Sequence, residues 1–257
     1  MQTDTDTITQ RTTAKAALKT ALATHNGDTK HPVVVDAIAY LASLNPTPNP
    51  AQDRALLEGN WLLISAPNFP GRLEDEVHRY VYTLGRLAFN KFQPVNLRVA
   101  LERVSQPVFA TGTENEYSHD IVVEFKIIDE DFPELKGIVK NLAVCSSVDE
   151  DTVQVEFTGG ELIPVADRNS EQISQWLKIF DSEGELSQIS LLDRLKFWWI
   201  ETMFGIGKVS AIDPNTGKQS FAIDKSPKGR LKLLYLDEEL RITKGNKETV
   251  LVCQREV

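Results

Sequence analysis

The spacing of hydrophobic residues changes once along this chain, at a proline-rich tract, and this change limits the folds that the chain can adopt. Before the tract, apolar residues recur at the spacing of an α-helix, whereas after it they mostly alternate, as in a half-buried β-strand. The tract, Asn45-Pro46-Thr47-Pro48-Asn49-Pro50, contains three prolines that cannot continue a helix. The sequence therefore predicts a helical arm and linker over residues 1–50, followed by a β domain over residues 51–257.

Two amphipathic helices are predicted within the arm. The first carries an apolar stripe of Ala14, Ala17, Leu18, Ala21 and Leu22, and the second, which can begin at Pro32, carries Val34, Ala37, Ile38, Leu41 and Leu44. One apolar face on each helix requires a surface to pack against. We expect the arm to cover the outside or one end of the β domain without lining its interior.

The β domain is predicted from apolar residues that alternate with polar ones. The clearest sets are Val95, Leu97, Val99 and Leu101; Ile121, Val123, Phe125 and Ile127; and Val153, Val155 and Phe157. Turns are predicted at Thr158-Gly159-Gly160, Asn215-Thr216-Gly217 and Gly245-Asn246. Antiparallel strands must close or pack as two sheets, because an open edge leaves backbone groups unpaired. The pattern predicts a barrel or sandwich, interrupted at residues 72–87 and by a loop and helix within residues 167–207.

Composition and motifs exclude several classes of function. The net charge of −9 disfavours nucleic acid as a partner, because it repels phosphate. The two cysteines form no CxxC pair, and none of the four histidines pairs with another at ligand spacing on one element, so we expect no metal and no cofactor. The acidic run Asp129-Glu130-Asp131 lacks the glycine of a calcium loop and indicates a solvated turn. No phosphate-binding, hydrolase or zinc-protease motif is present, which favours a protein that is not an enzyme.

Two motifs at the ends of the β domain carry a family resemblance. Gly59-Asn60-Trp61-Leu62-Leu63 has the form G-x-W-x-L. Near the C-terminus, residues 235–245 read YLDEELRITKG and are followed by the apolar residues Val250-Leu251-Val252. In these motifs and in their order, the chain resembles the plastid lipid-associated protein (fibrillin) family over residues 56–255. It departs from the family at Ile64-Ser65, where an aromatic residue followed by Thr or Ser is usual.

The resemblance implies a mainly β fold, namely a lipocalin-like antiparallel β-barrel, here with an N-terminal helical arm and an inserted helix. It also implies a non-enzymatic binding or carrier protein for an isoprenoid, quinone, carotenoid or acyl lipid. Such a protein is expected in the plastid stroma or on the cytoplasmic side of thylakoid membranes, soluble or peripheral. The alternative is a scaffold without a barrel ligand, which coats thylakoid or lipid-droplet surfaces and recruits an isoprenoid-synthesis enzyme.

The predicted ligand-binding residues are those expected to point into the barrel. They are Trp61, Leu97, Val99, Phe125, Phe157 and Tyr235. The alternative, that these side chains simply fill the barrel, stays open. We further predict that the guanidinium of Arg241 stacks on Trp61 and closes the barrel, because the first strand and the L-R-I strand are expected to be neighbours. Asp237 should cap the turn at the start of that strand, and Gly245 should adopt a positive φ at its end.

One segment, residues 191–206, stands outside the strand pattern. Leu192, Leu195, Trp199, Met203 and Ile206 fall on one helical stripe. Phe197, Trp198 and Phe204 lie off that stripe, so the segment is apolar over more of its circumference than core packing needs. We therefore predict that Phe197, Trp198, Trp199 and Phe204 contact a membrane surface. The alternative is a helix that lids the barrel with its aromatic side chains buried.

Overall fold

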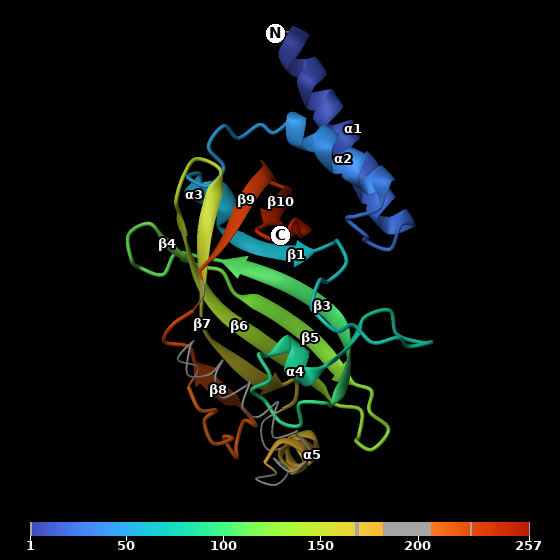
Figure 1. Cartoon of the computed structure of the whole chain (residues 1–257), viewed down its shortest axis with the longest axis vertical. Helices are drawn as coiled ribbons and strands as arrows, with labels where there is room; N and C mark the ends of the chain where they lie inside the picture. Colours follow the sequence, from blue (N-terminus) through green and yellow to red (C-terminus); the bar gives the residue numbers. More distant parts are fainter. Residues whose placement is uncertain (1, 168–169, 182–206, 227, 257) are drawn as a thin grey trace.

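Eight antiparallel strands close into a barrel (Figure 1). The computed structural model describes residues 2–167, 170–181, 207–226 and 228–256, and side chains from residue 6 onward. The strands, in their order around the barrel, are β1 (Gly59–Leu63), β3 (Arg98–Val108), β5 (Ile121–Ile127), β6 (Lys136–Ser147), β7 (Thr152–Pro164), β9 (Gly229–Leu236), β10 (Leu240–Gly245) and β11 (Val250–Glu256). Within the described residues, three shorter strands flank them: β2 (Val81–Thr83), β4 (Glu116–Ser118) and β8 (Gln219–Ala222). The predicted mainly β barrel is therefore confirmed.

The barrel closes where the last strand meets the first. β1 pairs with β11, with Trp61 opposite Arg255, and β6 pairs with β7 to complete the ring. The expectation that the L-R-I strand lies beside β1 was wrong. That strand is β10, which forms a hairpin with β11, and the hairpin places the C-terminal strand between β10 and β1.

The arm packs on the outside of the barrel, as predicted. It consists of α1 (Gln2–Thr24) and α2 (Pro32–Ser43), which lie together at one end of the molecule (Figure 1). Leu18 of α1 and Ile38 of α2 belong to one apolar cluster with Tyr235 and Ile242, which point outward from β9 and β10. Burial of this cluster holds the arm against the barrel wall.

A further helix covers the opposite end of the barrel (Figure 1). This helix, α5 (Glu171–Phe180), begins at Ser170, whose hydroxyl accepts a hydrogen bond from the backbone N–H of Ile173 (3.3 Å). Its Trp176 is fully buried between Phe125 and Phe180, and the indole N–H donates to the carbonyl of Gly217 (3.0 Å). The inserted helix was predicted at residues 191–206, which lie outside the described residues. The helix α5 instead lies in the preceding part, which was predicted to be a loop, and it packs its aromatic side chains into the barrel end.

Two local predictions about glycines were wrong. Thr158-Gly159-Gly160 is not a turn, because β7 continues through it. A Cβ at Gly160 would lie 2.6 Å from the ring of Phe221, so glycine here allows β8 to approach closely. Gly245 does not have a positive φ, and the turn after β10 instead places Glu248 at φ 60°. Within residues 72–87, where strand and helix predictions competed, the structure has β2 followed by the short helix α4 (Leu84–Leu87).

Candidate functional site: a lateral groove beside the barrel interior

Most of the predicted ligand-binding residues do point into the barrel. Leu97, Val99 and Phe125 belong to the apolar cluster on the α5 side, and Trp61 belongs to the cluster on the α3 side, where α3 spans Arg54–Leu57. Phe157 is half-buried and packs against both clusters. Leu97, Phe125 and Trp61 are at most 1% exposed, which indicates that they fill much of the interior.

Tyr235 is the exception among these residues. It lies in the outer cluster beneath the arm, and its hydroxyl donates to Asp237 (2.5 Å). From Leu233 to Leu236, β9 is apolar on both faces because the barrel interior covers one and the arm covers the other. Its hydrophobic pattern therefore could not indicate which face points inward, and Tyr235 is not part of the barrel lining.

The contact predicted between Trp61 and Arg241 is present, and a second arginine joins it. The guanidinium carbon of Arg241 lies 4.9 Å from the centre of the indole, and that of Arg255 lies 4.3 Å from it. Arg255 also donates to the backbone carbonyls of Glu58, Leu56 (2.5 Å) and Glu238 (2.8 Å). It thereby ties β11 to the start of β1 and to the β9–β10 turn, a closing role that sequence reasoning missed.

A lateral groove lies where β3 changes its partner strand. From Arg98 to Ala100, β3 pairs with β2, and from Ser105 to Val108 it pairs with β1. Between these stretches a β-bulge follows Leu101, and the groove lies along residues 101–104 of β3. The groove has a volume of about 520 Å³, within the usual range for small-molecule sites.

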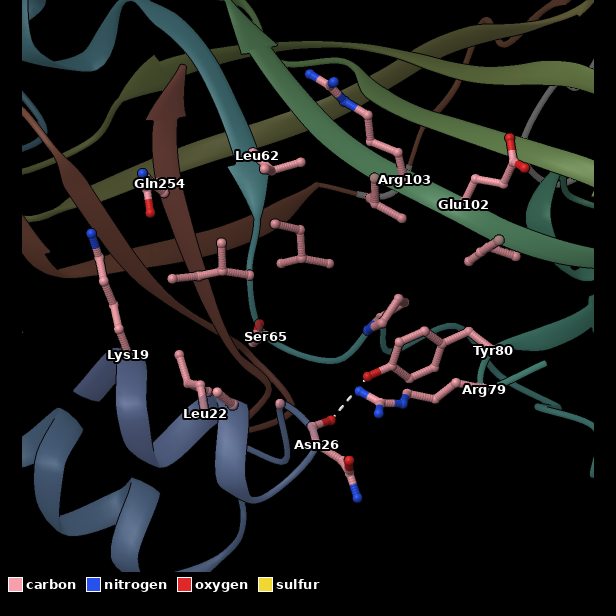
Figure 2. Close-up of a pocket in the computed structure, with 17 residues that line it drawn as sticks. Lys19, Leu22, Asn26, Leu62, Ser65, Arg79, Tyr80, Glu102, Arg103 and Gln254 are labelled. Carbon is pink, nitrogen blue, oxygen red and sulfur yellow. Dashed lines mark hydrogen bonds between the residues drawn. The ribbon is translucent and has the colours of Figure 1, made fainter. Parts of the chain in front are cut away.

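Segments that are far apart in the sequence build this groove. Lys19, Leu22 and Asn26 come from the arm, and Arg79 and Tyr80 approach from the other side (Figure 2). The hydroxyl of Tyr80 donates to the backbone carbonyl of Asn26 (2.9 Å), which bridges the two sides. Gly27 lies at the turn after α1 with φ +74°, and its carbonyl accepts from the N–H of Ala66 (2.9 Å). The arm is therefore one wall of the groove.

The floor of the groove is apolar and continuous with the barrel core. It is formed by Leu62, Leu63, Ile64, Leu101 and Val104. Val104 is 6% exposed and belongs to the interior cluster, and Leu63 packs against both interior clusters. Part of the floor therefore belongs to the packing of the barrel interior, whereas Ile64 packs against the outer cluster beneath the arm.

The rim of the groove is polar and mostly basic. Lys19 forms an ion pair with Glu239, and Arg103 forms one with Glu256. Arg79 is exposed and has no carboxylate partner among the described residues. An apolar floor beneath a basic rim suits a molecule with an apolar chain and a polar or anionic end.

Another groove, of about 560 Å³, lies between α1, the proline tract and the β9–β10 turn. Its walls carry the ion pairs that join the arm to the barrel: Lys15 contacts Asp237 (3.0 Å) and Glu239 (2.6 Å). Asp237 also caps the turn, as predicted, by accepting from the N–H groups of Glu239 and Leu240 (2.8 Å each). The acidic residues of the C-terminal motif therefore hold the arm, and this groove suits an apolar ligand less well.

The remaining expectations concern contact with a membrane and binding of a metal ion. Residues 197–199 and 204, the predicted membrane contact, lie outside the described residues. Within the described ranges, no three histidine, cysteine, aspartate or glutamate side chains gather where they could hold a metal ion. No helix in the part of the chain that the structure describes is long and apolar enough to cross a bilayer.

Comparisons with known proteins identify the family. The PAP_fibrillin family model matches residues 12–254, which include the arm as well as the barrel. The match therefore begins earlier than the resemblance over residues 56–255 that the two motifs indicated. Neither the curated proteins nor the solved structures gave a match. Because the family model spans nearly the whole chain, this protein belongs to the PAP/fibrillin family.

Proposed function

We propose that this protein binds and carries an elongated apolar molecule at photosynthetic membranes, and that it does not catalyse a reaction on it. An isoprenoid, a quinone, a carotenoid or an acyl lipid has the required shape. The observation that carries the proposal is the groove, whose floor of Leu63, Leu101 and Val104 continues into the core. Transfer of an apolar chain from water to such a floor is favourable by about 25 cal/mol per Å² of buried surface.

The lining of the groove supports binding more than catalysis. It contains no histidine or cysteine, and its buried serine, Ser65, accepts a hydrogen bond from the backbone N–H of Val252 (3.1 Å). A general base or nucleophile needs a partner within hydrogen-bond reach, and the described lining supplies no such pair. Membership of the PAP/fibrillin family agrees with a lipid-associated role.

Filling the groove from its outer wall tests the proposal. Ala23 is exposed on α1 and lines the groove, whereas Ala16 is exposed on the same helix and does not. We expect Ala23→Trp to lower the uptake of the neutral fluorescent hydrocarbon diphenylhexatriene at least tenfold, and Ala16→Trp to leave it unchanged. Equal uptake by both variants would place the ligand elsewhere, and no uptake by the folded wild type would contradict the carrier function.

A scaffold function is the second candidate, and two observations favour it. Trp61 and Trp176 fill the barrel, each with 0% of its surface exposed, so a hollow interior is not needed for this fold. On the arm, Val33 and Tyr40 of α2 are 52% and 54% exposed, which leaves an apolar surface that can contact a partner such as an isoprenoid-synthesis enzyme. A folded protein that takes up no probe, yet coats lipid vesicles or binds such an enzyme, would favour this function.

A further inference from the structure

Arg241 is a buried charge without a carboxylate partner among the described residues. It is 2% exposed and points into the barrel from β10. One of its terminal N–H groups donates to the side-chain oxygen of Gln106 (2.6 Å), while its Nε–H has no partner. By contrast, Arg98 pairs with Asp75 and Arg103 with Glu256. An unpaired charge in a protein interior is strongly unfavourable unless something compensates it.

The neighbours of Arg241 do not supply a negative charge. Burial, and then the charge of Arg241, lowers the pKa of His119 to about 3, so its imidazole is neutral at pH 7. Burial raises the pKa of the Cys145 thiol to about 11, and burial also raises the pKa of the Cys253 thiol. Both thiols are therefore protonated at pH 7, and the guanidinium keeps its charge there. The charge of Arg241 therefore faces the ring of Trp61 and the amide of Gln106, but no anion neutralises it among the described residues.

The floor of the groove separates this charge from the outside. Leu63 lies opposite Cys253, and Cys253 lies opposite Arg241 on the next strand. Val104 lies two residues before Gln106 in β3 and points into the interior. Gln106 accepts the hydrogen bond from the guanidinium of Arg241. Leu63 and Val104 both line the groove, so they are the side chains that would have to rotate for a ligand in the groove to reach Arg241.

We propose that Arg241 is the anchor for the carboxylate of an acyl-chain ligand, with the chain lying in the lateral groove. The free Nε–H is the donor that a carboxylate oxygen would accept from, and a charged hydrogen bond to guanidinium is shorter and stronger than a neutral one. The inference rests on the proposed function and names its ligand class: a long-chain carboxylic acid. Arg241 thus has a role in ligand selection as well as a contact with Trp61.

Binding of an acid and of its ester tests this anchor. We compare hexadecanoic acid, its methyl ester and acetate by displacement of diphenylhexatriene from the full chain at pH 7.5. The wild type should bind the acid at least tenfold more tightly than the ester, and acetate should not displace the probe, because it lacks the chain. Arg241→Met should bind acid and ester equally. Arg230→Met removes an exposed arginine of β9 that does not line the groove and should keep the preference for the acid, whereas Arg79→Met tests the rim of the groove as the alternative anchor.

A second variant keeps the test decisive if Arg241→Met does not fold. Gln106→Glu places a carboxylate beside the guanidinium, so it should abolish the preference for the acid, preserve ester binding and raise the melting temperature of the free protein. Equal wild-type affinities for acid and ester would overturn the anchor alone. Loss of the preference in Arg79→Met instead would place the carboxylate on the rim. If the wild type binds neither compound, the proposed function fails as well.

Discussion

At the scale of single residues, the ring of Trp61 joins parts of the chain that are distant in sequence. Arg241 and Arg255 lie over the indole, and its N–H donates to the carbonyl of Leu57 (2.9 Å). The G-x-W and L-R-I motifs are therefore structural at this point. The expectation that the barrel closes at these two motifs predicted the contact between Trp61 and Arg241, although β11 lies between their strands. The contact of Arg255 could not be predicted without the register of β11.

His119 should make the stability of the protein depend on pH. Its pKa is about 3 in the folded protein and 6.5 as a free side chain, so below pH 6.5 the unfolded chain binds a proton that the folded chain does not. Stability should therefore fall as the pH decreases from 6.5 toward 3, with a contribution of about 2 kcal/mol between pH 7 and pH 5. Urea unfolding of the wild type and His119→Gln at both pH values measures this. Parallel pH dependence in the two proteins would contradict the burial of a neutral imidazole.

Gly27 should tolerate no side chain, because its backbone and its surroundings both exclude one. Its φ is +74°, and a Cβ there would lie 2.5 Å from the backbone nitrogen of Ala66. Gly112 has φ +90° but nothing within 4 Å of a Cβ, so it is a matched control. Gly112→Ala should lose about 1–2 kcal/mol of unfolding free energy, and Gly27→Ala should lose about 3 kcal/mol or more, as measured by urea unfolding. Equal losses would show that the turn after α1 can move away from the barrel.

At the scale of elements, sequence periodicity predicted the type of each helix or strand more reliably than which of its faces points into the barrel. The helical stripes of α1 and α2 and the alternation in β3, β5 and β7 were sufficient to predict these elements, because each of them buries a well-defined face. The glycines at 159 and 160 were read as a turn because their actual role, the close approach of β8, depends on a strand more than 50 residues later in the chain. Tertiary contacts of this kind leave no local pattern.

The ion pairs of the C-terminal motif should hold α1 on the barrel. Hydrogen bonds from Lys15 and Lys19 lower the pKa of Glu239, so this carboxylate is charged at neutral pH and loses the pairing in acid. Glu239→Gln should speed amide hydrogen exchange in α1 severalfold while the barrel strands keep their protection. Glu238→Gln is the control, because that neighbouring side chain is exposed and has no ion pair among the described residues. Unchanged exchange in Glu239→Gln would mean that apolar packing alone holds the arm.

The aromatic segment at residues 191–206 should govern membrane contact through apolar insertion. The chain is acidic overall, so electrostatic attraction to anionic lipid contributes little, and binding should persist at high salt. Changing Trp198 and Trp199 together to Ser should weaken binding to vesicles of plastid-like galactolipids at least tenfold in a sedimentation assay, without loss of the fold. A double variant that unfolds, together with a wild type that does not bind vesicles, would show that these tryptophans are core residues.

At the scale of the whole molecule, the barrel, the arm and the family could be predicted from the sequence, but the groove could not. Its walls and floor come from Asn26, Leu63, Tyr80 and Val104, which are separated in the chain and meet where β3 changes partner between β2 and β1. The predicted site was the barrel interior, where large side chains now lie fully buried. We therefore propose that the ligand lies at the side of the barrel, with the arm as one wall.

The most direct test of this central claim is to identify what the protein carries. Wild type, Ala23→Trp and Ala16→Trp are purified from a photosynthetic host, shown to be folded by circular dichroism, extracted with organic solvent and analysed by mass spectrometry. We expect an apolar or acyl lipid in near-stoichiometric amount with the wild type and Ala16→Trp, and its depletion at least tenfold with Ala23→Trp. An extract from folded wild-type protein that contains no such lipid would contradict it.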